Sequence, residues 1–181
     1  MRLKIVAALC ASFALLFAFA PPAANAQTDS RDVTREKLRT LLTSAGARSD
    51  VNVSFRQSTR NEYNFVGSMT GLANADSLEI IISVTQHDTI GFRVYPHYKG
   101  NYINLSRAQN PTGLMKKLLW YSDQNFLFWG ADDEGDVFSG YTFTLESGFP
   151  EDAIIVVLRS IHNTDKFVGV LRGFYDGSSP A

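Results

Sequence analysis

The stretch LEIIISVTQHDTIGFRVY, from Leu78 to Tyr95, decides the fold. Its first part, Leu78 to Val84, has the density of β-branched residues that is typical of a central strand, and Ile90 to Tyr95 indicates a second strand. Only a short turn around Gln86-His87-Asp88 separates the two. Because a parallel crossover needs about a dozen residues, these two strands are predicted to be antiparallel.

Four other segments have the alternation or the short apolar runs that are typical of strands. A polar turn at 57–61 joins the first two into a hairpin, and the acidic turn Asp132-Asp133-Glu134-Gly135-Asp136 joins the last two. Pro96 lacks a backbone donor and is expected to end the pairing of the strand that precedes it. The additional strands are expected over residues 51–55, 63–69, 126–129 and 137–145.

Apolar residues at spacings of three and four predict three helices. Gly46 is expected to close the first as a C-terminal cap. Asn110-Pro111 starts the second, with Asn as N-cap and Pro in the first turn. Pro150-Glu151-Asp152 opens the third, where the two acids suit the helix dipole. The predicted helices cover residues 33–46, 111–123 and 150–171.

The predicted order of elements is α-β-β-β-β-α-β-β-α. Strands joined by short turns form an antiparallel sheet whose one face the helices can cover, so the fold class is α+β with helices packed on one face. A length of 181 residues suits one domain. We expect a single domain over residues 27–175 and a loose tail over 176–181, which is rich in Gly, Ser and Pro.

The first 26 residues have the organisation of a secretory signal. Arg2 and Lys4 precede an almost wholly apolar run over 5–20, and an Ala-Asn-Ala sequence ends at Ala26. The alternative is an uncleaved membrane anchor, but the run is shorter than the roughly 20 residues that span a bilayer. We predict cleavage after Ala26, a periplasmic or secreted protein without stable membrane insertion, and loss of the only cysteine, Cys10.

Composition and charge argue against a disordered chain and against a nucleic-acid-binding protein. Hydrophobic residues make up 45% of the chain and charged residues 19%, which is a globular composition. The formal net charge is -1, and loss of the signal would leave 15 basic against 18 acidic residues, a net charge of -3. This balance argues against a nucleic-acid partner held by a bulk basic field.

The chain contains no sequence motif for catalysis or for a cofactor. The three histidines, His87, His97 and His162, are isolated in sequence from one another, and none has metal-ligand spacing such as His-Glu-x-x-His. There is no Gly-x-Ser-x-Gly elbow and no Gly-Lys-Ser/Thr phosphate loop. We therefore expect surface histidines, no catalytic residue, no cofactor and a protein that is not an enzyme.

The acidic turn Asp132 to Asp136 is the strongest candidate for a cation site, because Ca²⁺ prefers several carboxylates. An EF-hand loop places a Glu six residues after its Gly, whereas Tyr141 stands six residues after Gly135. Asp and Gly are also ordinary turn formers, which is the alternative interpretation. No metal site is predicted, and calcium binding at this turn stays an open question.

The segment from Leu114 to Leu171 resembles the YbjN-like family of sensory transduction regulators. The resemblance rests on LMKKLLWYSDQN and FLFWG over 114–130, the acidic turn, FTLE over 143–146, and the helix from Pro150. It implies a fold like that of type III secretion chaperones, which are non-catalytic dimers that hold segments of other proteins. It brings no catalytic residue. The predicted secretion signal and the early hairpin depart from the family and argue against a cytoplasmic chaperone role.

Aromatic residues gather around the segment from Phe126 to Trp129, where alternation puts Phe126 and Phe128 on one face and Trp129 on the other. Large rings on both faces imply that one face needs a cover or a partner. The first hypothesis is a non-catalytic binding or regulatory module, expected to form a homodimer, that captures a protein or peptide through its sheet face or an edge strand. The second is a pocket for a small molecule or lipid between sheet and helices, with hydrolytic activity as a variant. The partner-binding residues are unknown at this point.

Overall fold

The computed structural model describes residues 30–179, and the predicted signal peptide lies outside them. The helices are α1 (Arg31–Gly46), η1 (Leu105–Arg107), α2 (Pro111–Gln124), α3 (Glu151–Ser160), η2 (Ile161–Asn163) and α4 (Thr164–Tyr175). The strands are β1 (Arg56–Gln57), β2 (Asn64–Met69), β3 (Ser77–Val84), β4 (Thr89–Tyr98), β5 (Asn101–Tyr102), β6 (Phe128–Ala131) and β7 (Val137–Thr144).

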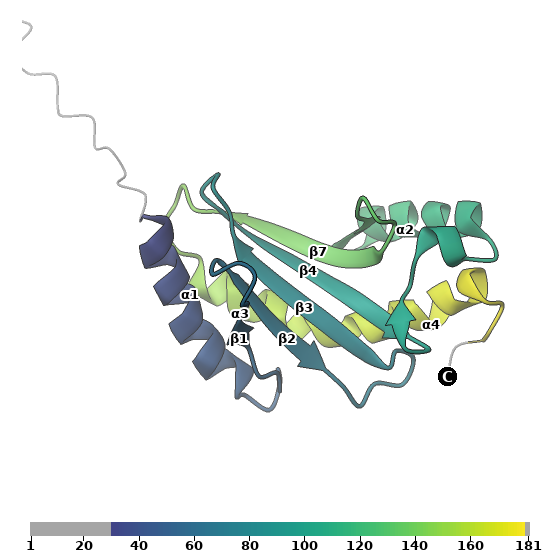
Figure 1. Cartoon of the computed structure of the whole chain (residues 1–181), viewed down its shortest axis with the longest axis horizontal. Coiled ribbons are helices and arrows are strands. Elements are labelled where there is room, and N and C mark those ends of the chain that lie inside the picture. The colour runs from purple at the N-terminus through teal and green to yellow at the C-terminus, as the bar shows by residue number, and fades with distance from the viewer. Residues whose placement is uncertain (1–29, 180–181) are drawn as a thin grey trace, which may run out of the picture.

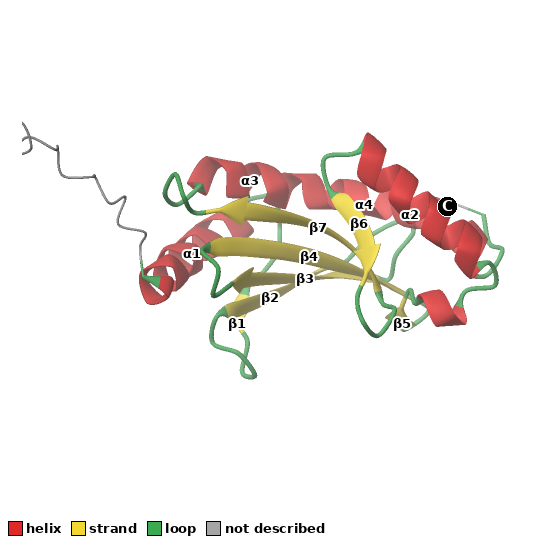
Figure 2. Ribbon diagram, turned by 90° about the horizontal axis from the view of Figure 1, so that it is seen from above, coloured by secondary structure: helices red, strands yellow, loops and turns green. Residues whose placement is uncertain are grey.

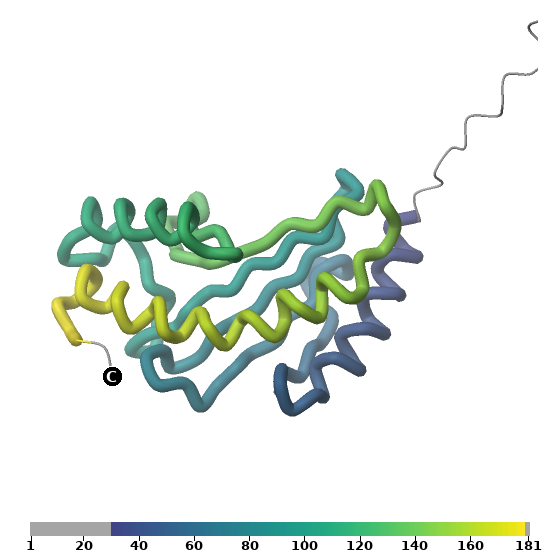
Figure 3. Tube along the Cα trace, turned by 180° about the vertical axis from the view of Figure 1, so that it is seen from behind, coloured from purple at the N-terminus to yellow at the C-terminus, as the bar shows by residue number. Residues whose placement is uncertain are grey.

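These strands form one antiparallel sheet, in the order β1-β2-β3-β4-β7-β6 with β5 paired to β4. In Figure 1 the strands lie in front of α3 and α4, and Figure 3 shows the same two helices crossing the back of the sheet. Figure 2, seen from above, places α1 and α3 on that same side. The predicted α+β fold with an antiparallel sheet is confirmed.

The covered face of the sheet, which packs against α1, α3 and α4, holds the core. Strand β3 shows the reason: every second side chain of its sequence is aliphatic and points to this face, and full burial of one such side chain stabilises the fold by about 1.5–3 kcal/mol. The side chains of this core that are 0–1% exposed include Leu78, Ile80, Ile82 and Val84 from β3, and Leu38, Leu42, Ile154, Leu158 and Leu171 from the helices.

The first predicted strand, 51–55, is not a strand. Asn52 has a φ of 51°, which breaks an extended backbone, and the Val53 N–H donates to the Gly46 carbonyl at 2.9 Å. Val51 and Val53 are buried as alternation suggested, but their segment turns against the end of α1, and pairing with β2 begins only at Arg56.

Gly46 is not a left-handed cap. It is the last residue of α1, and the C-cap is Ala47 with a φ of -74°. A Cβ at Gly46 would lie 2.3 Å from the Val53 carbonyl oxygen, so glycine is needed here because two backbone segments approach closely.

Pro96 does not end its strand, since β4 continues to Tyr98 and Pro96 pairs with Leu78. The Pro96 carbonyl accepts from the Ile103 N–H at 3.2 Å. In an antiparallel strand the nitrogen and oxygen of one residue point to the same side, so the missing donor faces the β5 side and leaves the pairing with β3 intact.

The third predicted helix is divided. Residues 161–163 form the 3-10 turn η2, and α3 and α4 continue on either side of it along the sheet (Figure 3). The strand expected at 126–129 begins only at Phe128, so the expected shared face of Phe126 and Phe128 is wrong: Phe126 precedes β6 and stacks on Tyr141 at 4.7 Å. The described part of the expected loose tail is tied down, because the Asp176 carboxylate accepts from Lys99 at 2.6 Å.

Candidate binding surface on the open face of the sheet

The open face is the side of the sheet opposite α1, α3 and α4. The strand register arranges its side chains in rows that cross the strands. The central row contains, from β1 to β6, Arg56, Val66, Ile81, Arg93, Gly140 and Phe128. The row on one side contains Asn64, Ser83, Gly91 and Thr142, and the row on the other side contains Ser68, Glu79 and Tyr95. This face therefore mixes guanidinium groups, small polar side chains and rings with the aliphatic Val66 and Ile81.

Four rings pack against one another at one end of this face. The centroid distances are 5.6 Å from Tyr102 to Tyr95, 5.6 Å from Tyr95 to Phe138 and 5.9 Å from Phe138 to Phe128. Gly140 makes room for this cluster, because a Cβ there would lie 2.8 Å from the Phe128 ring. Phe128 is 40% exposed, so the ring cluster ends in a ring that is available for contact.

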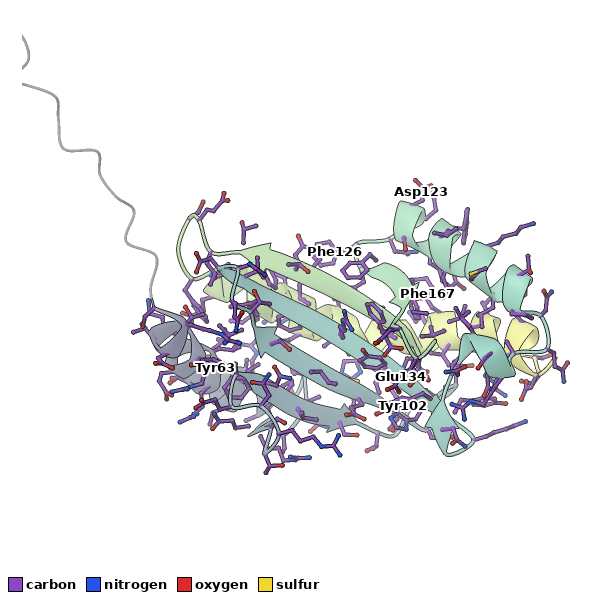
Figure 4. The ribbon with its side chains drawn as sticks, turned by 45° about the horizontal axis from the view of Figure 1, so that its top comes forward. Tyr63, Tyr102, Asp123, Phe126, Glu134 and Phe167 are labelled. Atoms are coloured by element: carbon purple, nitrogen blue, oxygen red, sulfur yellow. The ribbon has the colours of Figure 1, made fainter. Side chains whose placement is uncertain are left out.

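Glu79, His97 and Tyr102 meet beside the rings. The Tyr102 hydroxyl donates to Glu79 Oε2 at 2.7 Å, and His97 Nε2 lies 3.3 Å from the same oxygen. Burial, followed by the hydrogen bond to Glu79, raises the pKa of Tyr102 well above its usual range. Figure 4 shows Tyr102 at the β5 end of the sheet.

His97 is isolated in the sequence from the other two histidines, and this cluster was not predicted. Its members come from three strands and are up to 23 residues apart. The available signal was Glu79, the one acidic residue inside the aliphatic run of β3. The side chains of His97 and Glu79 are 26% and 28% exposed, so they lie at the open surface and not in a deep hollow. No serine or threonine hydroxyl within residues 30–179 hydrogen-bonds to the His97 ring.

Two adjoining hollows occupy the rest of the open face. One, of about 500 Å³, lies over Ser83 and Gly91, with Arg93 and Phe128 among its lining residues. The other, of about 570 Å³, is lined by Arg56, Arg60 and Tyr102 among others. They share Asn64 and Ile81 and so form one shallow depression across the strands. A Cβ added at Gly91 would meet no other atom within 4 Å, so no neighbouring side chain covers the sheet at this position.

The other two histidines lie away from this surface and are exposed, as expected. His87 is in the β3–β4 turn and His162 is in η2.

The acidic turn is organised by its own backbone. Asp132 Oδ1 accepts the N–H groups of Glu134 and Asp136, and Asp136 Oδ1 accepts from Asn104 Nδ2 at 2.7 Å. These bonds engage one carboxylate oxygen of Asp132 and one of Asp136. Among the described residues, no group of three or more His, Cys, Asp or Glu side chains is placed to hold a metal ion.

A second surface feature, the apolar strip, consists of exposed apolar side chains of α2. Leu119 is 70% exposed and Trp120 53%. The strip contains Met115, Leu119 and Trp120.

The outer edge of β6, one of the edges considered for strand addition, is occupied beside this strip. Ser122 Oγ of α2 lies 2.8 Å from both the backbone nitrogen and the carbonyl oxygen of Trp129.

A further hollow of about 350 Å³ lies between β6 and α4. Phe126, Trp129 and Phe167 are among its lining residues, with Lys166 at its side. Figure 4 labels two of these lining residues, Phe126 and Phe167.

In comparisons with known proteins, no family model and no curated protein matches the chain. Within residues 30–179, no helix combines the length and the apolar character that crossing a membrane requires.

Proposed function

We propose that this chain is a periplasmic or secreted, non-catalytic binding or regulatory module of YbjN-like type, and that it engages a protein or peptide partner through the open face of its sheet. The observation that carries the proposal is the asymmetry of the sheet. Helices α1, α3 and α4 pack on one face, while residues from all seven strands line a depression on the other face. Exposed apolar and aromatic groups rimmed by polar groups are typical of interaction surfaces.

The size of the depression favours a chain segment over a small ligand. Its two hollows adjoin and are both open to solvent, whereas small-molecule sites enclose most of the ligand surface. Phe128 and Ile81 offer apolar contact, and Asn64 and Ser83 offer hydrogen bonds to a peptide backbone. The Glu79, His97 and Tyr102 cluster lies at the edge of this surface, where we assign it contact with the partner and no chemistry.

A substitution that fills the depression tests the proposal. Gly91→Trp adds a large side chain where a Cβ meets nothing within 4 Å, so the protein should fold and the floor should be blocked. Val156→Trp, on an α3 position that is 53% exposed, adds the same side chain on the opposite side of the molecule. Peptides selected from a random library against the purified protein should lose at least about tenfold in affinity for the first variant and none for the second.

Equal binding of the selected peptides to both variants would place the peptide site elsewhere and overturn the proposal. Circular dichroism and thermal melting of both variants establish that they are folded before binding is compared.

Homodimer formation, implied by the family resemblance, belongs to the same proposal. The apolar strip supplies the side chains for it, because Leu119 and Trp120 are large and more than half exposed. Sedimentation equilibrium of the wild type and of Leu119→Lys should give a dimer and a monomer respectively. A monomeric wild type at high concentration would remove the dimer from the proposal.

The alternative function is a small-molecule or lipid-binding protein. The hollow between β6 and α4 supports it, since Phe126, Trp129 and Phe167 offer an apolar lining for about 350 Å³. Native mass spectrometry of the purified protein would detect a retained ligand, and Phe167→Ala should weaken its retention. A ligand lost in this variant and retained in Gly91→Trp would favour the alternative over the open face.

A further inference from the structure

We infer that the partner of the open face is an acidic peptide segment whose carboxylates are held by Arg56 and Arg93, with an apolar residue between them on Val66 and Ile81. This inference rests on the proposed function and adds the chemistry of the partner to it. The juxtaposition that carries it is the central row, in which two arginines stand on either side of two aliphatic residues on adjacent strands.

The arginines of the open face have no carboxylate partners within residues 30–179. Within residues 30–179, the guanidinium groups of Arg56 and Arg60 make neither an ion pair nor a hydrogen bond. Arg93 donates only to the Tyr95 hydroxyl, at 3.2 Å, and lies 4.6 Å from the centre of the Phe138 ring. Away from this face, Arg35, Arg39, Arg48, Arg107 and Arg159 face carboxylates. Arg31 and Arg172 donate to backbone carbonyl groups.

The depression of the open face is lined by more positive than negative side chains. Three guanidinium groups, Arg56, Arg60 and Arg93, line its two hollows, and Glu79 is the only carboxylate that lines them. Glu79 is already engaged by Tyr102 and His97. The chain as a whole carries a net charge of -1, so positive charge is concentrated on this face against the overall sign. Guanidinium groups bind carboxylates through paired, charge-assisted hydrogen bonds.

The spacing of the two arginines suits an extended peptide. Arg56 and Arg93 are three strands apart in one row, which is about 14 Å at about 4.8 Å per strand. An extended peptide rises about 3.3 Å per residue, and side chains at positions i, i+2 and i+4 point to one side. Carboxylates at i and i+4 are therefore separated by about 13 Å and match the two arginines, while the residue at i+2 meets the half-buried Val66 and Ile81.

The spacing defines the probe. A fluorescein-labelled peptide that contains Glu-Thr-Val-Thr-Glu is titrated with the purified full-length protein and followed by fluorescence anisotropy. Two control peptides are used: one has Gln in place of both Glu residues, and the other shortens the spacing so that the two Glu side chains point to opposite sides. We expect each control to bind at least about tenfold more weakly, and the affinity of the probe to fall as salt increases.

Substitutions on the protein complete the test. Arg56→Gln and Arg93→Gln should each weaken probe binding by about tenfold, because each removes one charge-assisted pair. Lys116→Gln removes a positive charge from an exposed position on α2 and should leave affinity unchanged. Arg93→Glu should bind a peptide with Lys at the second acidic position better than it binds the probe. This gain of binding could not come from a misfolded variant.

Three results would overturn the inference. Equal binding of the Glu and Gln peptides, with both lost in Gly91→Trp, would remove the preference for acids while leaving peptide binding at the open face in place. Failure of the probe to bind, while library peptides still bind this face, would do the same. Tighter binding to phosphatidylglycerol vesicles than to the probe, with loss in Arg56→Gln and Arg93→Gln, would assign the row to a membrane surface.

Discussion

The two faces of strand β3 differ in chemistry although they belong to the same eight residues. On the covered face, Leu78, Ile80, Ile82 and Val84 are at most 1% exposed. On the open face, Glu79, Ile81 and Ser83 are partly exposed and border a depression. A face selected only for contact with water needs neither unpaired arginines nor an isoleucine on its floor. The difference therefore separates two roles: the covered face holds the fold together, and the open face is the surface for which we propose contact with another molecule.

The largest effect should separate neighbouring isoleucines of β3. Ile82→Ala removes a fully buried side chain from the covered face and should lower the free energy of unfolding by about 2–5 kcal/mol. Ile81→Ala, on the open face, should lower it by less than about 1 kcal/mol, because the site is open to solvent. Urea unfolding followed by circular dichroism measures both. Equal losses would mean that the open face is also part of the core.

A smaller loss is expected at the far end of the covered face, where Asp165 of α4 holds the loop before β3. Its carboxylate accepts the N–H groups of Ala73, Asn74 and Ala75 at 2.8–3.0 Å. Asp165→Ala should cost about 3 kcal/mol, since backbone donors lose a charged acceptor. Asp152→Ala, at an exposed position in the first turn of α3, is the control and should cost less than about 1 kcal/mol. If Asp165→Ala lowers stability as little as Asp152→Ala does, the loop before β3 is held by other contacts.

Two glycines, one on each face, sharpen the comparison further. A Cβ at Gly67, on the covered side, would lie 2.5 Å from Val53 Cγ1, whereas a Cβ at Gly91 meets nothing within 4 Å. Gly67→Ala should destabilise the protein by about 1–3 kcal/mol through overpacking. Gly91→Ala should be neutral or stabilising by up to about 1 kcal/mol. Thermal melting of both variants checks the sign, and a destabilised Gly91→Ala would reveal a cover over the open face.

The smallest effect concerns alkaline pH. Burial raises the pKa of Tyr121 to about 12, from about 10 in an unfolded chain. The unfolded state therefore releases this proton first, so stability is fully present below about pH 10 and falls as the pH rises towards about 12. Tyr121→Phe should make this fall less steep in urea midpoints measured from about pH 8 to about pH 12. An unchanged slope would attribute the loss to other groups, such as Tyr102 on the open face.

The fold was largely predictable from sequence because hydrophobic spacing records burial. The β-branched density of Leu78 to Val84 gave β3, and the Asn110-Pro111 start gave α2 with its expected cap. The failures occurred where backbone geometry overrode spacing. Val51 and Val53 alternate like a strand but pack against the end of a helix, and Pro96 is tolerated because its missing donor faces away from β3.

The candidate surface was not predictable residue by residue. Sequence indicated that one face would lack a complete cover, but the central row joins Arg56 to Arg93 only through the register of four strands. His97 and Tyr102 pair across the β4–β5 hairpin, but Glu79, which contacts both, comes from β3 and is distant in sequence. Pairings of this kind depend on strand order, which the residue pattern leaves undetermined.

The hydroxyl of Ser122 has a consequence for how the protein behaves at high concentration. It occupies both hydrogen-bonding groups that Trp129 presents on the outer side of β6, so a helix stands where a further strand would otherwise dock. Unprotected strand edges are templates for polymerisation, and here α2 would have to detach before the sheet could grow through this edge. The Ser122 hydroxyl therefore helps to protect the protein from aggregation through this edge. The variant Ser122→Ala should aggregate more readily at high protein concentration.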